Sequence, residues 1–257
     1  GKSFDLPLLE TRFIIARQPP RLTGAPHLDL LPAARRFWRY SLASCALSSL
    51  ETEILGVERT QDDVPGWLIP SLYTDYARSG DAREMPRISY HNIQDILSLV
   101  TLTARMCDLI TAPLPPEGDL PGEELYGLGR FLEEMGQLDQ AESAYNRAAL
   151  TCRTARVGEL AMRDLAYLLK RRGRRGEALP WWQRLVQRAG EVYACEELAK
   201  HWEWQEVDLP QAVAWTERGL ASAGAWPPGR KRQETLEALR HRLDRLQRKM
   251  GGTGSAE

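Results

Sequence analysis

The second half of this 257-residue chain repeats itself, and that repetition limits how the chain can fold. Small and large residues recur 37 positions later with unchanged spacing: Gly136, Ala141, Tyr145 and Ala148 are followed by Gly173, Ala178, Trp182 and Leu185. A looser third unit places Ala199 and Ala212 at offsets of 33 and 34 from Ala166 and Ala178. A small residue lets two helices approach closely, and the large residue four positions later fills the groove beside it. The spacing predicts a stack of helical hairpins over residues 123–250.

The first unit resembles a tetratricopeptide repeat. Its matching residues are Leu128-Gly129-Arg130-Phe131-Leu132, Gly136, Ala141, Tyr145 and Ala148. The later units are looser, because Ala166 and Ala199 replace the first glycine and Trp202 takes an aromatic position. We expect a charged helix over residues 229–250 to cap the stack and residues 251–257 to form a disordered tail.

A proline-rich segment separates this region from the rest of the chain. Residues 113–122 read Pro-Leu-Pro-Pro-Glu-Gly-Asp-Leu-Pro-Gly, which suits neither a helix nor a central strand. We therefore expect a linker there and a first domain over residues 1–112. Helical periodicity in that domain runs from Leu47 to Leu55, ending at Gly56, and again from Asp95 to Ile110. The pattern is typical of the helix-rich rear of an α/β domain, with too few strands to form its sheet.

Composition indicates an ordinary water-soluble protein. Hydrophobic residues make up 43% and charged residues 27% of the chain, and no apolar run is long enough to cross a bilayer, so no membrane partner is expected. The four cysteines are widely spaced and form no zinc motif with the histidines. They are interpreted as reduced, mostly buried thiols, which favours a cytoplasmic location.

The net charge of −1 excludes general attraction to polyanions, but the charge is unevenly distributed. Residues 113–145 are acidic and residues 146–190 are basic. The densest cationic run is Lys170, Arg171, Arg172, Arg174 and Arg175. This run is either a solvated turn between repeat helices or a patch that contacts nucleic-acid phosphates. Six tryptophans between residues 181 and 226 are expected to pack in the repeats, with stacking on single-stranded bases as the alternative.

Two places in the first domain carry candidate site residues. Asp5 precedes Leu-Pro-Leu-Leu, so it is either the N-cap of a helix or a carboxylate that binds metal. His91 and Asp95 lie four positions apart and share one helix face, directly after Tyr90. They form either a surface hydrogen bond or a carboxylate on Mg²⁺ with a neighbouring His or Tyr that holds the attacking water.

Five ordered motifs carry a family resemblance over residues 1 to about 110. They are Gly-Lys-Ser-Phe-Asp-Leu-Pro-Leu-Leu-Glu (1–10), His-Leu-Asp-Leu-Leu (27–31), Leu-Ser-Ser-Leu-Glu with Leu-Gly-Val-Glu-Arg (47–59), Asp-Val-Pro-Gly-Trp-Leu-Ile-Pro (63–70) and Tyr-His-Asn-Ile-Gln-Asp-Ile-Leu-Ser-Leu (90–99). This order resembles the YprB-like predicted exonucleases, a ribonuclease H-like family related to the DnaQ-type (DEDD) 3′–5′ exonucleases.

The resemblance implies a fold and a reaction. The chain would be mostly α: the C-terminal part of an α/β ribonuclease H-like domain, followed by an all-α tetratricopeptide-like domain. The family would hydrolyse phosphodiesters of single-stranded DNA or RNA with two Mg²⁺ or Mn²⁺ ions. The resemblance makes Asp5 and Asp95 metal ligands and His91 or Tyr90 the residue that orients the water. It gives Asp29 no metal role.

Two departures weaken the catalytic expectation. The family's Asp-x-Glu pair is absent because the chain begins after it, so the metal site would be incomplete and this polypeptide inactive by itself. The spacing of the last motif is also exchanged, with His91 four and Tyr90 five positions before Asp95. One alternative is a non-catalytic helical-repeat scaffold that captures a protein or peptide, attached to a vestigial nuclease fold. Another is nucleic-acid binding without cleavage.

If these residues form only part of the domain, sheet-facing side chains such as Leu8, Phe13 and Ile15 would be exposed.

Overall fold

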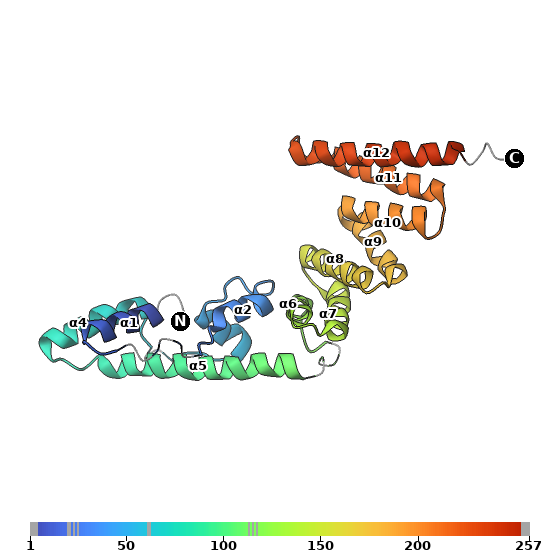
Figure 1. Ribbon diagram of the computed structural model, residues 1–257. Coiled ribbons are helices and arrows are strands. Elements are labelled where there is room, and N and C mark those ends of the chain that lie inside the picture. The colour runs from blue at the N-terminus through green and yellow to red at the C-terminus, as the bar shows by residue number, and fades with distance from the viewer. Residues whose placement is uncertain are drawn as a thin grey trace. The chain divides into compact units, whose positions relative to one another are not determined.

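The computed structural model describes residues 5–252, except 20, 21, 23, 25, 61, 62, 113, 115 and 117, and it leaves out the side chains of Asp5 and Gly252. Residues 253–257 of the tail predicted over 251–257 lie outside the described residues. Helices and loops, with no strand, make up this part of the chain, so the mostly-α prediction is confirmed (Figure 1). The chain divides into two compact units, Gly1–Pro115 and Pro116–Glu257.

The first unit is built around one long helix, α5. Its helices are α1 (Asp5–Ile15), α2 (Leu30–Trp38), α3 (Leu47–Leu50), the π-helical turn η1 (Glu51–Leu55), the 3₁₀ turn η2 (Gly66–Leu68), α4 (Ile69–Ser79) and α5 (Met85–Thr111). Helix α5 begins ten residues before the predicted start at Asp95. Pro86 lies in its first turn, where the missing N–H group of proline costs no hydrogen bond.

The turn η1 directs one acidic residue inward. Helix α3 continues into η1, which ends at Gly56 in a left-handed conformation (φ 64°), as the sequence predicted for this glycine. A π-helical turn shifts the helical register by part of a turn. Glu51, the first residue of η1, is 1% exposed, whereas Glu53 two positions later is exposed. This inward placement of Glu51 creates the polar cluster described below.

The first unit has a small core and a large apolar surface. Its core includes Phe37 and Trp38, whose rings lie 5.5 Å apart, and Leu102 of α5. Leu8 and Ile15 of α1 are 48% and 69% exposed, as predicted, and Phe13 is half-buried. One face of α5 also exposes apolar side chains, at Ile93, Ile96, Leu97 and Val100.

The second unit is a stack of helices in consecutive contact. Its members are α6 (Gly122–Glu134), α7 (Leu138–Thr151), α8 (Ala155–Arg171), α9 (Arg175–Ala189), α10 (Val192–Trp204), α11 (Leu209–Gly224) and α12 (Arg230–Gly252). Helices pair as α6 with α7, α8 with α9 and α10 with α11, and α12 packs on α11 (Figure 1). The predicted helical hairpins and final charged helix are therefore present. Helix α12 continues through the described Gly251 into the segment predicted as the tail.

The repeated residues occupy the helix crossings. Tyr145 and Trp182 are fully buried, 37 positions apart, and Gly136 and Gly173 both adopt a φ of 75° in equivalent turns. A Cβ atom added to Gly129 would lie 2.8 Å from the Tyr145 ring, closer than real Cβ contacts. The Tyr145 hydroxyl donates to Glu133 over 2.8 Å. The small residue thus admits an aromatic ring to the crossing, as the spacing predicted.

Substitution of Gly129 by Ala tests this close approach. The new Cβ would push against the Tyr145 ring, so we expect Gly129→Ala to destabilise the protein by about 1–3 kcal/mol, as overpacking does. Gly176→Ala in α9 is the matched control, since a Cβ at Gly176 meets nothing within 4 Å. The control should be neutral or stabilising. Chemical denaturation measures both variants, and equal stability of the two would contradict the account.

Candidate functional site

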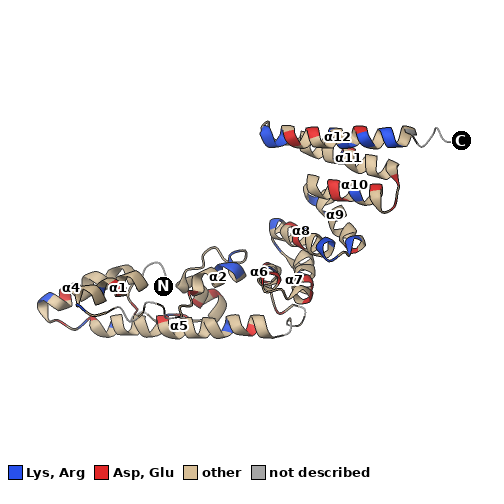
Figure 2. Ribbon diagram, viewed as in Figure 1, with Lys and Arg blue, Asp and Glu red and all other residues tan. Residues whose placement is uncertain are grey.

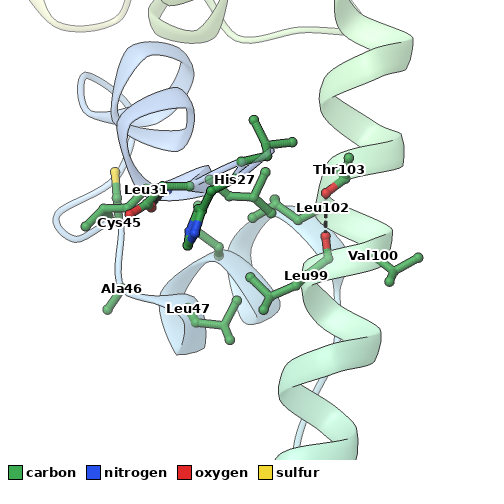
Figure 3. A pocket seen from close by; sticks show the side chains of 13 residues that line it. His27, Leu31, Cys45, Ala46, Leu47, Leu99, Val100, Leu102 and Thr103 are labelled. Carbon is green, nitrogen blue, oxygen red and sulfur yellow. Dashed lines mark hydrogen bonds between the residues drawn. The ribbon is translucent and has the colours of Figure 1, made fainter. Parts of the chain in front are cut away.

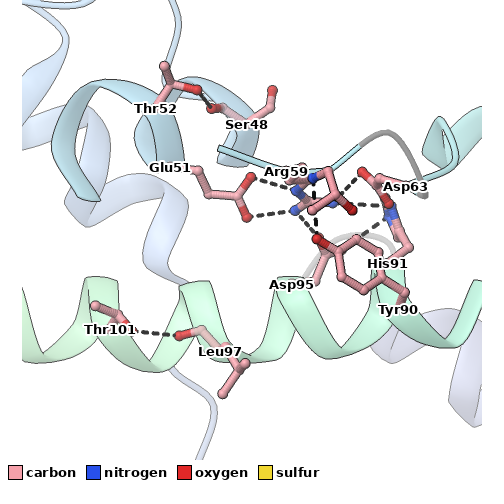
Figure 4. Close-up of polar contacts among 11 residues, drawn as sticks. Ser48, Glu51, Thr52, Arg59, Asp63, Tyr90, His91, Asp95, Leu97 and Thr101 are labelled. Atoms are coloured by element: carbon pink, nitrogen blue, oxygen red, sulfur yellow. Dashed lines mark hydrogen bonds and ion pairs between the residues drawn. The ribbon is translucent and has the colours of Figure 1, made fainter. Parts of the chain in front are cut away.

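The side chain of Arg59 is the centre of a polar cluster in the first unit (Figure 4). Arg59 lies in the loop between η1 and η2, and its guanidinium grips Glu51 with two hydrogen bonds. Nε donates to Oε2 over 2.8 Å and Nη2 donates to Oε1 over 2.6 Å. Two parallel bonds to a carboxylate fix the guanidinium in both position and orientation. The buried Glu51 therefore anchors Arg59.

The other edge of the guanidinium faces α5 and the loop that precedes η2. Arg59 Nη1 donates to Asp63 Oδ2 over 3.1 Å, and Nη2 donates to Asp95 Oδ1 over 2.5 Å. His91 Nδ1 lies 2.9 Å from Asp63 Oδ1 and 3.1 Å from Arg59 Nη1. We assign the imidazole proton to Nδ1, which donates to Asp63 over the shorter distance. Nε2 then keeps its lone pair, 3.5 Å from Asp95 Oδ2.

These contacts favour the charged forms of the side chains. Burial raises the pKa of Asp63, but hydrogen bonds from His91 and Arg59 outweigh it and hold the pKa below the ordinary value. Burial likewise raises the pKa of Glu51, and bonds from Arg59 and Ser98 bring it below the ordinary value. The hydrogen bonds to Glu51 raise the pKa of Arg59. The cluster therefore holds three carboxylates around one permanent cation.

The predicted site residues are brought together only in part. His91 and Asp95 share the inner face of α5, as their spacing predicted. Tyr90 is half-buried and points elsewhere, since its hydroxyl accepts the Thr60 N–H over 3.3 Å. Asp5 begins α1, but its side chain is not among the described ones, so its N-cap and metal-ligand interpretations both stay predictions.

Sequence reasoning missed three members of the cluster: Glu51, Arg59 and Asp63. Each lies in a motif that carried the family resemblance, at the end of Leu-Ser-Ser-Leu-Glu, at the end of Leu-Gly-Val-Glu-Arg and at the start of Asp-Val-Pro-Gly. Each of these motifs begins or ends with a charged residue, and this shared position could have marked the three residues as members of a site.

The described side chains do not form a metal centre. Among the described side chains, which do not include that of Asp5, no group of three or more His, Cys, Asp and Glu is placed to hold an ion. Arg59 lies between Glu51, Asp63 and Asp95 and bonds all three carboxylates. The described side chains therefore do not fit a two-metal site, and the metal role that the resemblance gives Asp5 stays a prediction.

An apolar pocket of about 600 Å³ opens beside the cluster, among α2, α3 and α5 (Figure 3). Its lining residues are His27, Leu28, Asp29, Leu30, Leu31, Cys45, Ala46, Leu47, Leu50, Leu99, Val100, Leu102 and Thr103. Asp29 caps α2, since its Oδ1 accepts the Leu31 N–H over 3.0 Å. Asp29 therefore has a structural task at the start of α2.

The predicted basic patch lies around the turn between α8 and α9 (Figure 2), and its cations form ion pairs. Each cation of the run has a carboxylate partner: Lys170 and Arg175 bind Glu197, Arg171 binds Glu133, Arg172 binds Asp139 and Glu142, and Arg174 binds Glu142 and Glu177. The run therefore joins α6, α7, α8, α9 and α10. These contacts favour the structural interpretation of the run, and phosphate binding by it stays a prediction.

The four cysteines are free thiols, and they differ in how far they are buried. Cys195 is buried and Cys45 and Cys152 are half-buried, whereas Cys107 on α5 is exposed. The expectation of mostly buried thiols is thus wrong for Cys107, because it lies on the exposed side of α5.

No helix among the described residues is both long and apolar enough to span a membrane.

Comparison with known proteins bears on the first unit. Residues 1–107 match a family model described as the RNase_H superfamily. A ribonuclease H superfamily domain therefore lies in this part of the chain. Over 255 residues the chain is also 31% identical to a Bacillus subtilis (strain 168) protein named Uncharacterized protein YprB. That alignment covers 97% of this chain and 59% of the relative, so the chain spans about three fifths of the relative's length.

The comparisons confirm the ribonuclease H-like part of the resemblance. The match lies at the N-terminal end of this chain and ends five residues before the predicted boundary at 112. Exonuclease activity, the position of these residues within a complete ribonuclease H-like domain and the tetratricopeptide identity of the repeats stay predictions.

The network around Glu197 makes a prediction about pH. Glu197 is 1% exposed, and although burial raises its pKa, the bonds from Lys200 and Lys170 hold the pKa below 4.5. As the pH falls, Glu197 therefore takes up a proton at a higher pH in the unfolded chain than in the folded chain. The stabilisation is complete above the unfolded pKa and is lost as the pH falls through the folded pKa.

We therefore expect Glu197→Gln to lower the free energy of unfolding at pH 7 by about 1–2 kcal/mol, because three partly exposed cations lose their buried partner. The difference between wild type and variant should shrink below about pH 4.5. Urea denaturation between pH 3 and pH 7 measures it, with the exposed Glu217→Gln of α11 as control. A difference that does not change with pH would contradict the predicted role.

Proposed function

We propose that this chain carries a nuclease-type ribonuclease H-like domain that acts on phosphodiester bonds of single-stranded nucleic acid, as a 3′–5′ exonuclease in the cytoplasm. The observation that supports it most is the pairing of His91 and Asp95 on one face of α5 within the superfamily match. A basic imidazole nitrogen beside a carboxylate is suited to holding a water molecule for attack on phosphorus.

The protein's own groups give His91 a defined task. Asp63 accepts the proton on Nδ1 and so fixes the tautomer and the ring orientation. Nε2 then accepts a hydrogen bond from the attacking water, and Asp95 Oδ2 on the same helix face accepts the second one. Tyr90 is the alternative water-holding residue, but its hydroxyl is bonded to Thr60.

Metal use is a separate part of the proposal. Ribonuclease H-like proteins generally use divalent metals, and the resemblance assigns Asp5 and Asp95 to Mg²⁺ or Mn²⁺. The activity is proposed for the full-length natural protein.

A second candidate function is a helical-repeat scaffold on a non-catalytic nuclease fold. Two observations favour it: Arg59 fills the acidic cluster, and the second unit is a regular stack of helical hairpins. Such stacks commonly present a groove to a protein or peptide.

Phosphate binding by the run from Lys170 to Arg175 would have to compete with the ion pairs of the run. We therefore expect the affinity for nucleic acid to depend only weakly on salt concentration.

The test is degradation of 5′-labelled single-stranded DNA and RNA by the full-length protein with Mg²⁺ or Mn²⁺. We expect Asp95→Asn to lower the rate by about 100-fold or more, the usual effect of removing a group that acts in the chemical step. Asp75→Asn, an exposed acid on α4, is the matched control and should leave the rate unchanged. Equal rates for both variants would favour the scaffold function instead.

A further inference from the structure

The guanidinium of Arg59 occupies the centre of the acidic cluster, between Glu51, Asp63 and Asp95. It donates to both oxygens of Glu51, to Asp63 Oδ2 and to Asp95 Oδ1. The second oxygen of Asp63 is bonded to His91 Nδ1. An ion that approached these carboxylates would therefore meet oxygens already used by hydrogen bonds, and it would be repelled by the guanidinium charge a few ångströms away.

The chemistry of the cluster would nevertheless suit another cation if the guanidinium were withdrawn. Glu51, Asp63 and Asp95 surround Arg59. Carboxylate oxygens are ligands that suit Mn²⁺. The side chain of Asp95 is 35% exposed, against 16% for Arg59, so solvent ions reach Asp95 first. Arg59 is thus the cation that a divalent ion would have to displace from Asp95.

Arg59 is also firmly held. Its anchor Glu51 is 1% exposed, and withdrawing the guanidinium would leave that buried carboxylate without its two-pronged ion pair. We propose that Arg59 is the resident cation of the cluster and competes with divalent cations for Asp95, so that it controls metal access to this carboxylate. The inference rests on contacts within this chain and goes beyond the proposed nuclease activity.

Mn²⁺ binding to the chain tests the proposal without any activity assay. Mn²⁺ is added to wild type, Arg59→Met and Arg59→Lys, and the ion is located by paramagnetic broadening of the His91 ring signals. Calorimetry gives the Kd. We expect Arg59→Met to bind Mn²⁺ about tenfold or more tightly than wild type, because a nearby positive charge has been removed. Arg59→Lys should lie between them, since one ammonium cannot bond all three carboxylates.

Two controls separate this effect from a general change of charge. Arg59→Met combined with Asp63→Asn removes one carboxylate and should abolish most of the gain. Arg83→Met deletes an 87% exposed arginine that pairs with Asp81, away from the cluster, and should not change the Kd. If Arg59→Met does not fold, Arg59→Lys decides.

A Kd in the folded Arg59 variants equal to that of wild type would overturn the proposal, as would Mn²⁺ that leaves the His91 signals unbroadened. Because nuclease activity is not measured, failure of the proposed function would leave this result unaffected. Tighter binding in the Arg59 variants together with an inactive full-length protein would support the resident cation and refute the nuclease.

Discussion

The two-pronged pair between Glu51 and Arg59 is the interaction on which the polar site of the first unit depends. Glu51 lies on the inner face of the helical segment formed by α3 and η1, and the guanidinium it holds reaches across to α5. Asp95 and His91 take their orientation from this cation and from Asp63. One buried carboxylate thereby sets the geometry of residues more than thirty positions away in the sequence.

The second unit is stabilised by a different combination of contacts. Small residues at the helix crossings admit buried aromatic rings, as at Gly129 and Tyr145. Between the hairpins, buried acids collect cations: Glu197 binds Lys170, Arg175 and Lys200, and Glu203 binds three cations of α12. Basic residues of this unit that suggested a nucleic-acid surface thus join its helices to each other.

The sequence was informative wherever one helix determined the geometry. The spacing of His91 and Asp95 predicted a shared face, and the offset of 37 residues predicted the equivalent positions of Tyr145 and Trp182. The sequence was uninformative where the path of a loop determines which side chains come into contact. Arg59 reaches Asp95 because of the path of a loop. Glu51 lies four positions after Leu47, on the apolar face of its helix, so the helical period indicates its inward position but not the partner that it meets there. The acidic partners of the basic run lie on other helices, so its composition alone suggested a free cationic patch.

The central claim is that Glu51 and Arg59 act as one unit that organises the cluster. A double-mutant cycle tests it most directly, with unfolding free energies measured for wild type, Glu51→Gln, Arg59→Met and the double variant. We predict a coupling energy of about 2–3 kcal/mol, because Arg59→Met leaves the buried Glu51 without its two-pronged ion pair and Glu51→Gln removes the charge that anchors Arg59. Additive effects, with a coupling below about 0.5 kcal/mol, would show that the two residues stabilise the fold independently and would contradict the account.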